Sequence, residues 1–317
     1  MMLTKKEWLL EASITLKSIA KKIDKEVVLA DLSIGVENNS NHAIIGQNGS
    51  GKSSILKILV GIIEKDAGIA YIDGKDISTR SNETRMMTGY MPQYIDLDDE
   101  ITIYENLFIY SQLFNVSEDK AKLRIQNFSE IFDFKEFLFE KSSNLSLGML
   151  RSIQFCRALL HDPKILLLDQ PTSGMDPQNK LKLWNIIDRI GNDKTILFST
   201  QDFSEAEKYA DRISIIHQGD IKMDGSLGTL VNATKGLNKF EIRFKHSVDE
   251  EILSIFNDMP TVLKPTINGN SIEFYSNSKN DFFKVLRHVI DLEIENIDIN
   301  FCRLLDLYLG LVENGLE

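Results

Sequence analysis

The sequence is poor in the residues that build disulfide frameworks and zinc sites. Its 317 residues include only two cysteines, Cys156 and Cys302, which lie far apart and show no CxxC spacing. The five histidines are scattered, without the spacing of metal ligands. We therefore expect reduced thiols and structural or surface histidines, rather than a disulfide scaffold or a zinc centre.

Long apolar runs and an excess of basic residues are also missing. No run approaches the roughly 18–20 apolar residues that cross a bilayer, and the opening MMLTKKEWLLEASITL is too broken by charge for a signal peptide. The net charge of −11 argues against broad nucleic-acid binding, because phosphate backbones are met by clusters of Lys and Arg. We expect a cytosolic protein that reaches a membrane only by docking to other subunits.

The composition that is present suits an ordinary globular protein of two domains, with 43% hydrophobic and 26% charged residues. From Ser13 to about Ile216, short apolar runs alternate with helical patterns, which predicts a layered α/β domain. The apolar runs predict a sheet covered on both faces. Strands are predicted at residues 27–36, 41–46, 164–169, 194–200 and 212–217, and helices at 50–63 and between Ile103 and Phe139.

The remainder of the chain predicts a second, smaller domain. A Gly/Asn-rich passage, residues 219–238, is interpreted as a linker. The order strand–helix–strand–strand–helix–strand then predicts a ferredoxin-like α+β module, followed by an amphipathic helix at 303–315. The predicted domains are residues 1–235, with a helical subdomain at about 95–160, and residues 236–317. An N-terminal helix carrying Trp8 is expected to pack on the first domain rather than to enter lipid.

The strongest motif is GQNGSGKS, Gly46 to Ser53, which matches GxxxxGK[ST] and follows a predicted strand. Its glycines let successive backbone N–H groups turn inward around an anion, and the following helix adds its positive end. Lys52 is expected to reach the β- and γ-phosphates, and the Ser53 hydroxyl to ligate Mg²⁺. The alternative is a chance glycine-rich turn before a helix. The residues predicted to bind the nucleotide are Gly46, Gln47, Asn48, Gly49, Ser50, Gly51, Lys52, Ser53 and Ser54.

The stretch KILLLD predicts the second half of the site, a buried strand that brings Asp169 beside the magnesium ion. Taken alone this signal is weak, because many core strands end in Asp. Together with GQNGSGKS, which forms the P-loop, this strand predicts a site for Mg-ATP.

Five motifs in this order resemble those of the ATP-binding subunits of ABC transporters, over about residues 13–232. They are GQNGSGKS, the Q-loop in GYMPQ, the signature LSLGM, LLLDQP and the D-loop SGMD. The resemblance implies the ABC type of P-loop NTPase fold, a mixed sheet with a helical subdomain. It also implies that two such domains enclose two ATP molecules and act on integral membrane permease subunits, at the cytoplasmic face of the plasma membrane.

The resemblance assigns further residues by position. Gln93 would touch Mg²⁺ and couple the site to the membrane subunits, Ser146 and Gly148 would contact the γ-phosphate held by the partner subunit, and Asp176 would bridge the two halves. The signature departs from LSGGQ at Leu147 and Met149. Versions of the SLGM type, and an appended ferredoxin-like module, resemble the exporters of drugs, lipids and polysaccharides.

Three positions depart from the family's functional residues. Gln170 replaces the Glu that polarises the attacking water, Gln201 replaces the His of the H-loop, and Ile23 stands where an aromatic ring normally stacks on adenine. Loss of a general base costs about 10²–10⁴-fold in rate, whereas loss of base stacking costs about 1–3 kcal/mol of binding. We therefore expect ATP binding with slow or absent hydrolysis in this chain's own site. Gln170 could be a laboratory substitution made to trap ATP, but Gln201 would then be a second, unexplained change.

Alternatives remain open at this point. A heterodimer with a competent partner would have one good site, whereas a homodimer would have two poor ones. The chain could also be a nucleotide-gated regulatory subunit that never turns over. A soluble ABC ATPase of DNA repair or translation is disfavoured, because coiled-coil insertions, zinc cysteines, a second ATP-binding half and basic patches are missing. Tyr104, Phe108 and Tyr110 follow the Q-loop and are candidates for a docking surface, although buried packing would explain most of them. The phenylalanines of 128–139 are expected in the core of the helical subdomain, with a docking surface as the alternative.

Overall fold

The computed structural model describes residues 12–191, 193–233, 238–248, 250–260, 262–276, 279–290, 292–300 and 303–314. The chain divides into two compact units, residues 1–226 and 227–317. Cys302 and the predicted N-terminal helix with Trp8 lie outside the described residues.

A six-stranded sheet forms the centre of the first unit, in the order β10-β9-β3-β8-β7-β6. The pairs β9–β3, β3–β8, β8–β7 and β7–β6 are parallel, and β10 is added to β9 as an antiparallel hairpin. Every residue of β7 and of β8 is buried, as expected of a sheet covered on both faces. The strands are β3 (Asn41–Ile45), β6 (Thr88–Met91), β7 (Ile165–Asp169), β8 (Thr195–Thr200), β9 (Arg212–His217) and β10 (Asp220–Gly225).

A second, antiparallel sheet of the first unit has the order β2-β1-β4-β5. Its first hairpin turns at Asp24 and Lys25, both with positive φ, which suits the twist of the two strands it joins. Its inward side chains share one hydrophobic core with the apolar face of α2 (Lys52–Leu59) and with β3 and β7. The strands are β1 (Ile14–Ile23), β2 (Glu26–Val36), β4 (Ala67–Ile72) and β5 (Lys75–Asp76).

The helix α2 is shorter than the sequence pattern predicted. It ends at Leu59 rather than near residue 63, and Gly61 then takes a left-handed φ of 71°. The N–H of Gly61 donates to Ile58 O and that of Ile62 donates to Lys57 O, so the last carbonyls of the helix are capped. The apolar residues beyond Gly61 continued the helical spacing, but the glycine stops the helix.

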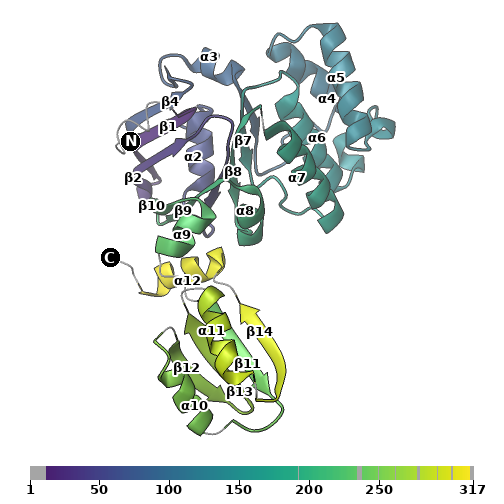
Figure 1. Ribbon diagram of the computed structural model, residues 1–317. Helices are drawn as coiled ribbons and strands as arrows, with labels where there is room; N and C mark the ends of the chain where they lie inside the picture. The colour runs from purple at the N-terminus through teal and green to yellow at the C-terminus, as the bar shows by residue number, and fades with distance from the viewer. Residues whose placement is uncertain are drawn as a thin grey trace. The chain divides into compact units, whose positions relative to one another are not determined.

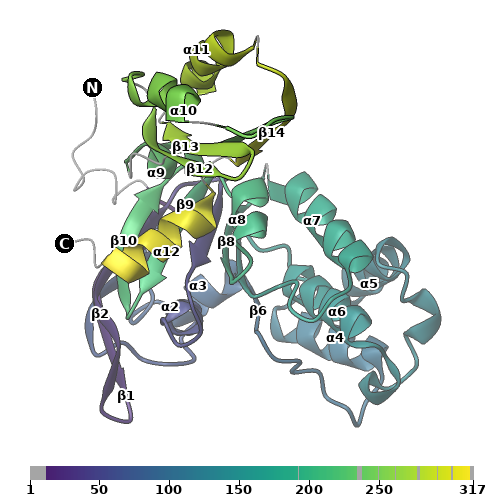
Figure 2. The same ribbon diagram turned by 90° about the horizontal axis from the view of Figure 1, so that it is seen from below.

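The helical stretch predicted after Ile103 is confirmed. Figures 1 and 2 show α4, α5 and α6 gathered on one side of the unit, away from the antiparallel sheet. Thr102 and Glu105 form a capping box at the start of α4. The elements of this subdomain are α4 (Ile103–Leu113), α5 (Glu118–Ile131), the 3-10 turns η1 (Lys135–Phe137) and η2 (Ser142–Asn144), and α6 (Leu147–Leu159). The remaining helices of this unit are α3 (Ser81–Met86), α7 (Pro177–Gly191) and α8 (Phe203–Tyr209).

The passage interpreted as a linker contains regular structure, so that interpretation was wrong for residues 220–233. Gln218 and Gly219, both with positive φ, form a two-residue turn that folds β10 back onto β9. Residues 227–233 form α9 (Leu227–Ala233) in the second unit. Gly219 lies in the tight turn of this hairpin, whereas Gly225 ends β10 and Gly228 lies within α9.

The second unit has the ferredoxin-like arrangement that its pattern predicted. Its sheet has the order β12-β13-β11-β14 and is antiparallel throughout. Phe240, Ile242, Phe256 and Phe274 are among the side chains that form its core. The elements are β11 (Asn238–Phe244), α10 (Glu250–Asn257), β12 (Leu263–Asn268), β13 (Ser271–Ser276), α11 (Lys279–Val289), β14 (Ile294–Asn300) and α12 (Leu304–Asn314).

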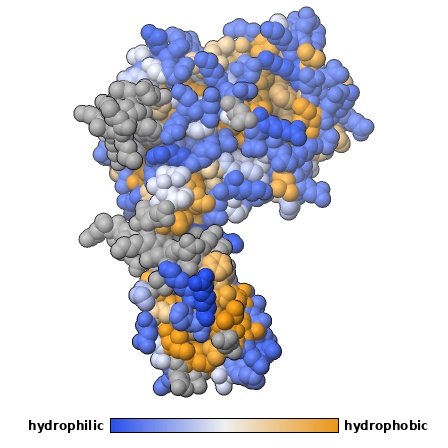
Figure 3. Space-filling view, viewed as in Figure 1, coloured by the Kyte–Doolittle hydropathy of each residue, from blue (hydrophilic) through white to orange (hydrophobic). Residues whose placement is uncertain are grey.

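Hydrophobic side chains are also exposed on the second unit, where Figure 3 shows them gathered on one face. Phe283 is 59% exposed and Ile290 is 63% exposed. Among the described residues, none of the helices combines the length and the apolar character needed to span a bilayer.

Candidate functional site

The loop between β3 and α2 has the geometry of an anion-binding cradle. Gly51 caps α2 with a φ of 106°, and a Cβ atom there would lie 2.6 Å from Leu29 Cδ2. A Cβ atom on Gly46 would lie 2.3 Å from the carbonyl oxygen of Ile216. Both positions therefore require glycine, one for its backbone conformation and the other for the close approach of β9.

Lys52 is the buried cation of this loop. Its Nζ donates to the carbonyl oxygens of Gly46 and Gln47, both at 2.7 Å. Burial lowers the pKa of Lys52 to about 8, an effect that the nearby carboxylate of Asp169 opposes. The ammonium is thus held inside the loop, at the N-terminal end of a helix, where an anion would meet both charges.

Asp169 lies across from the loop at the carboxyl end of β7 and is completely buried. Its Oδ1 accepts hydrogen bonds from Ser53 Oγ at 3.1 Å and from Ser199 Oγ at 2.6 Å. Its Oδ2 is buried without a hydrogen-bond partner. The register of β7 and β8, which pairs Asp169 with Ser199, brings the two side chains together.

The geometry around Asp169 fits a magnesium ion. A buried carboxylate oxygen without a partner is costly unless a cation or a donor satisfies it. The hydroxyl of Ser53 and the carboxylate of Asp169 are oxygen ligands of the kind that Mg²⁺ prefers, and Mg²⁺ in such sites takes its other ligands from phosphates and water. The donor set present therefore suits Mg²⁺ bound together with a nucleotide.

Gln170 and Gln201 lie at the rim of this site. The N–H of Gln170 donates to Ser199 Oγ at 3.0 Å and to Ser199 O at 3.1 Å, and the residue has a φ of 50°. Gln201 Nε2 donates to Asn48 Oδ1 in the P-loop at 2.5 Å. Both glutamines line a cavity of about 220 Å³, together with Lys180 and Glu205. A water in this cavity would meet the two amides as well as the Glu205 carboxylate and the Lys180 ammonium, and an amide, unlike a carboxylate, cannot accept a proton from water.

The predicted signature and D-loop residues lie beside each other. Ser146 Oγ accepts the N–H of Met149 at 3.3 Å and so caps α6. A Cβ atom on Gly148 would lie 3.8 Å from Asp176 Oδ2, and one on Gly174 would lie 2.5 Å from Leu147 Cδ2. Leu147, one of the two residues at which the signature departs from LSGGQ, therefore packs on the D-loop of the same chain.

Two further predicted residues lie outside the P-loop and β7. Gln93 follows β6, in the segment between Met91 and α4. Ile23 ends β1 beside its hairpin turn and is 42% exposed. The role of Ile23 at adenine stays a prediction.

The sequence alone did not point to Ser199 or Glu205. Ser199 links Asp169 and Gln170 through one hydroxyl, and Glu205 is a buried carboxylate whose oxygens accept from Thr172 Oγ1 at 2.5 Å and Thr200 Oγ1 at 2.9 Å. Both belong to the run FSTQDFSEAE, in which the family motif points only to the position of Gln201. The signal that could have identified them is the group of polar residues at the end of the buried strand β8, which is parallel to the strand that ends in Asp169.

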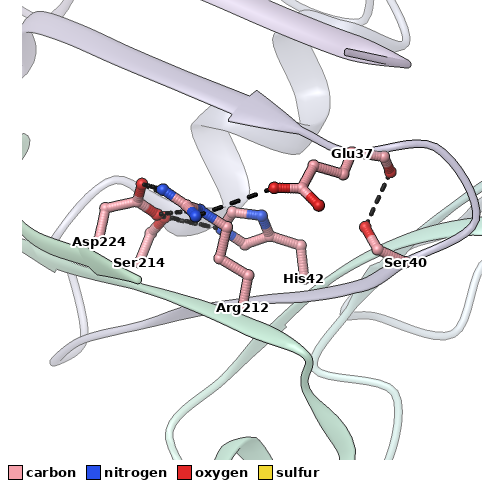
Figure 4. Close-up of polar contacts among 6 residues, drawn as sticks. All are labelled: Glu37, Ser40, His42, Arg212, Ser214 and Asp224. Atoms are coloured by element: carbon pink, nitrogen blue, oxygen red, sulfur yellow. Dashed lines mark hydrogen bonds and ion pairs between the residues drawn. The ribbon is translucent and has the colours of Figure 1, made fainter. Parts of the chain in front are cut away.

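A cluster of Ser, His and Asp elsewhere in this unit does not form a catalytic triad. His42 Nε2 lies 2.7 Å from Ser214 Oγ, which donates to Asp224 Oδ1 at 2.8 Å (Figure 4). Arg212 pairs with Asp224 and, at 3.9 Å, with Glu37. Ser214 and His42 are fully buried, so a substrate cannot reach the hydroxyl. The cluster joins β3, β9 and β10 through side-chain hydrogen bonds.

A P-loop with its buried lysine, opposite a strand that ends in a carboxylate, defines the class of P-loop nucleotide-binding proteins. A family model described as ABC transporter matches residues 29–173. The chain is also 32% identical over 232 residues to the Nod factor export ATP-binding protein I of Burkholderia orbicola (strain AU 1054), covering 73% of this chain and 76% of that protein. The chain belongs to the ATP-binding subunits of the ABC transporter family.

Other relatives and solved structures agree with this assignment. The protein of the same name from Rhizobium sp. (strain N33) is 30% identical over 267 residues, covering 84% of this chain and 86% of that protein. A solved ATP-binding subunit of an ABC transporter is 26% identical, with a TM-score of 0.66 over 70% of this chain and 93% of its own. A dimeric ATP-binding cassette bound to ADP and Pi, at 24% identity, shares the fold with a TM-score of 0.62 over 68% of this chain and 98% of its own. The ABC-type fold predicted from the motifs is confirmed.

Proposed function

We propose that this chain is an ATP-binding subunit of an exporter-type ABC transporter that holds Mg-ATP in its own site and hydrolyses it slowly or not at all. One observation carries the proposal. Around Asp169, the groups that would serve the phosphates and the metal are in place, whereas the neighbouring position for the attacking water is the amide of Gln170.

Each residue of the site has a proposed role. Lys52 neutralises the phosphates, Ser53 and Asp169 hold Mg²⁺, and Gln93 adds a contact to the metal. When bound, Mg²⁺ neutralises charge on the phosphate oxygens. Gln170 and Gln201 lie beside the water and the γ-phosphate, where an amide can hold a water by hydrogen bonds but cannot take its proton. The hydrogen bond from Gln201 to Asn48 supports its place beside the P-loop.

Glu205 does not replace the missing base in this proposal. It lines the same cavity as Gln170, but its two carboxylate oxygens already accept hydrogen bonds from Thr172 and Thr200. Lys180 Nζ lies 3.6 Å from one of them. A carboxylate engaged on both oxygens is poorly disposed to accept a proton from water.

The partners follow from the retained motifs. Ser146, Gly148 and Asp176 would serve ATP held by a second nucleotide-binding subunit, and we favour a heterodimer in which that subunit is competent. The pair would act on integral permease subunits at the cytoplasmic face of the membrane. The relatives named for Nod factor export, together with the SLGM signature, support an export role.

The proposal is tested by restoring the missing groups. We expect the double variant Gln170→Glu, Gln201→His to raise phosphate release, because restoration of a general base contributes about 10²–10⁴-fold. The assay uses the chain co-purified with its native partners, with the Kd for Mg-ATP measured alongside. The two changes act on one step, so their separate effects should not simply add.

Two control variants make this result specific. Gln178→Glu adds the same charge at the exposed start of α7 and should leave turnover unchanged. Adding Lys52→Ala to the restored chain should remove the gain, because the phosphates lose their cation. If ATP binds normally and the restored chain turns over no faster, slow chemistry at Gln170 and Gln201 is not the defect.

A second candidate is a nucleotide-gated regulatory subunit, which the same two glutamines favour. Such a chain would bind ATP to assemble or regulate a membrane complex. Phosphate release by the native complex distinguishes the two candidates. A complex that binds ATP and closes but releases no phosphate would be a regulatory switch.

A further inference from the structure

The signature helix α6 buries three long polar side chains along one face. Arg151, Gln154 and Arg157 are 3%, 0% and 8% exposed. Residues three apart lie on the same side of a helix. Burial of an amide and two guanidinium groups is costly unless their hydrogen bonds are made elsewhere, so their partners show what this face of α6 is built to hold.

All three side chains reach the backbone of the Q-loop, residues 92–96. Arg151 Nη1 donates to Pro92 O at 2.9 Å, and Arg157 Nη1 donates to Asp96 O at 3.2 Å. Gln154 Nε2 donates to Tyr94 O at 2.6 Å and to Asp96 Oδ1 at 2.7 Å. The amide oxygen of Gln154 accepts from Arg151 Nη1 at 3.3 Å, and Asp96 Oδ1 accepts from both Gln154 and Arg157, so the three side chains form one network.

This network holds the main chain on both sides of Gln93. The carbonyls of Pro92 and Tyr94, the two neighbours of Gln93, are bound to α6. The same helix begins at Ser146, whose hydroxyl caps its first turn. A displacement of the Q-loop backbone is therefore resisted by a helix whose other end carries the signature.

We propose that Gln154 is a positioning residue that couples Gln93 to the signature at Ser146. Gln154 ties the Q-loop backbone to α6. Nucleotide bound at Gln93 in this chain's site therefore shifts α6, and with it the signature around Ser146 that would face the nucleotide of a partner subunit. Gln154 touches neither nucleotide nor metal. The inference rests on the functions proposed for Gln93 and Ser146. The hydrogen bonds between α6 and the Q-loop do not depend on those functions.

The contact to Tyr94 is tested by chymotrypsin cleavage of the free full-length chain. The Tyr94 side chain is 75% exposed, but the carbonyl that the protease must polarise is the one bound by Gln154. We expect Gln154→Ala to speed cleavage after Tyr94 about tenfold, because a buried hydrogen bond no longer opposes local opening. Cleavage after Phe139, which is 77% exposed and outside this network, should keep its rate.

The coupling is tested by hydrogen exchange of residues 145–150 with and without Mg-ATP. In the native chain, Mg-ATP should change this exchange. In Gln154→Ala, the Kd for Mg-ATP should stay within about threefold, since the P-loop is untouched, while most of the change at 145–150 is lost. Ser152→Ala is the matched control, because Ser152 is buried on α6 but bonds only Gly148 O of its own helix.

The outcomes separate the two proposals. An unchanged response at residues 145–150 in Gln154→Ala, with ATP bound, would overturn the coupling role. A loss of the same size in Ser152→Ala would also overturn it, since any weakening of α6 would then suffice. If the native chain binds no Mg-ATP, the proposed function fails, and cleavage after Tyr94 still decides whether Gln154 holds the Q-loop.

Discussion

At the scale of single residues, Asp169 and Gln170 are neighbours whose surroundings differ. The Asp169 side chain is fixed by Ser53 and Ser199, whereas Gln170 is fixed through its backbone N–H to Ser199. Its side chain faces the cavity that it shares with Gln201. The backbone conformation at residue 170 therefore does not depend on the amide, so Glu can be placed there without rebuilding the site.

Lys52 should make ATP binding depend on pH. Burial lowers its pKa to about 8, and bound phosphates would raise it, so binding takes up a proton when the pH exceeds 8. The affinity for Mg-ATP should then fall by up to about tenfold per pH unit above pH 8 and stay flat below it. Titration calorimetry at pH 7, 8 and 9, in buffers of different ionisation enthalpy, measures both the affinity and the proton uptake.

Lys52→Arg is the matched control for this pH dependence, because a guanidinium keeps its charge throughout the range. The variant should bind more weakly than the native chain, since its geometry differs, but equally at pH 8 and pH 9. A native chain with the same affinity at all three pH values would show that the Lys52 ammonium does not lose its proton in this range.

The residues of the site were predictable where a motif is local. GQNGSGKS predicted the cradle and KILLLD predicted Asp169, because each lies directly after a strand. The hydroxyl of Ser199 and the bond from Gln201 to Asn48 depend on the register of β8, which joins positions about 30 and 150 residues apart in the chain. Such pairings are set by the packing of the whole sheet and are not visible in a short pattern.

At the scale of elements, the cluster that joins β3, β9 and β10 should make the fold sensitive to acid. Burial lowers the pKa of His42 to about 4, although Asp224 opposes this and Arg212 adds to it. The folded pKa lies below the unfolded value of 6.5, so the unfolded chain binds more protons between these pH values. His42 should therefore cost the fold about 3 kcal/mol as the pH falls from 6.5 to 4.

Denaturant unfolding of His42→Gln against pH measures this cost. The variant keeps an amide for Ser214 but cannot titrate, so its stability should fall less steeply below pH 6.5 than that of the native chain. Between pH 4 and 6.5, the slopes of the unfolding free energy against pH should differ between the two chains by the equivalent of nearly one bound proton. Parallel curves for the two chains would show that His42 is not held neutral in the fold.

The elements themselves were largely predictable, and the exceptions have local causes. The strands at 164–169 and 194–200 were correct because they are buried on both faces and apolar throughout. The helix at 50–63 was too long because the apolar spacing continues past Gly61, where the left-handed backbone ends it. The linker interpretation was wrong for residues 220–233, because a short hairpin and a short helix that contain glycine have the composition of a linker.

At the scale of the whole molecule, the two glutamines that replace hydrolytic residues belong to one of the two sites of the proposed dimer. Gln170 and Gln201 would serve this chain's own ATP, whereas Ser146, Gly148 and Asp176 would serve a partner's. Leu147 packs on Gly174, so the retained signature and D-loop form one connected surface. The domain boundaries and the role of the ferredoxin-like module remain predictions, because neither follows from the geometry of this site.

This asymmetry predicts unequal effects in the native complex. In a heterodimer, Ser146→Ala should lower phosphate release by about 10²-fold, as expected when one charge-stabilising donor is removed from the competent site. Lys52→Ala in the same chain should change the release by only a few-fold, since its own site contributes little turnover. Phosphate release of the co-purified complex, measured at saturating Mg-ATP, gives both values.

Thr102→Ala is the matched control, because both Ser146 and Thr102 cap helices of the same subdomain. Loss of such a cap costs about 1 kcal/mol of stability in either variant, so only an effect beyond that of Thr102→Ala reports on catalysis. In a homodimer both sites carry the substitution, so Ser146→Ala and Lys52→Ala would each lower turnover strongly. A large loss for both variants would therefore exclude the heterodimer, and a large loss for Ser146→Ala alone would place hydrolysis in the partner's site.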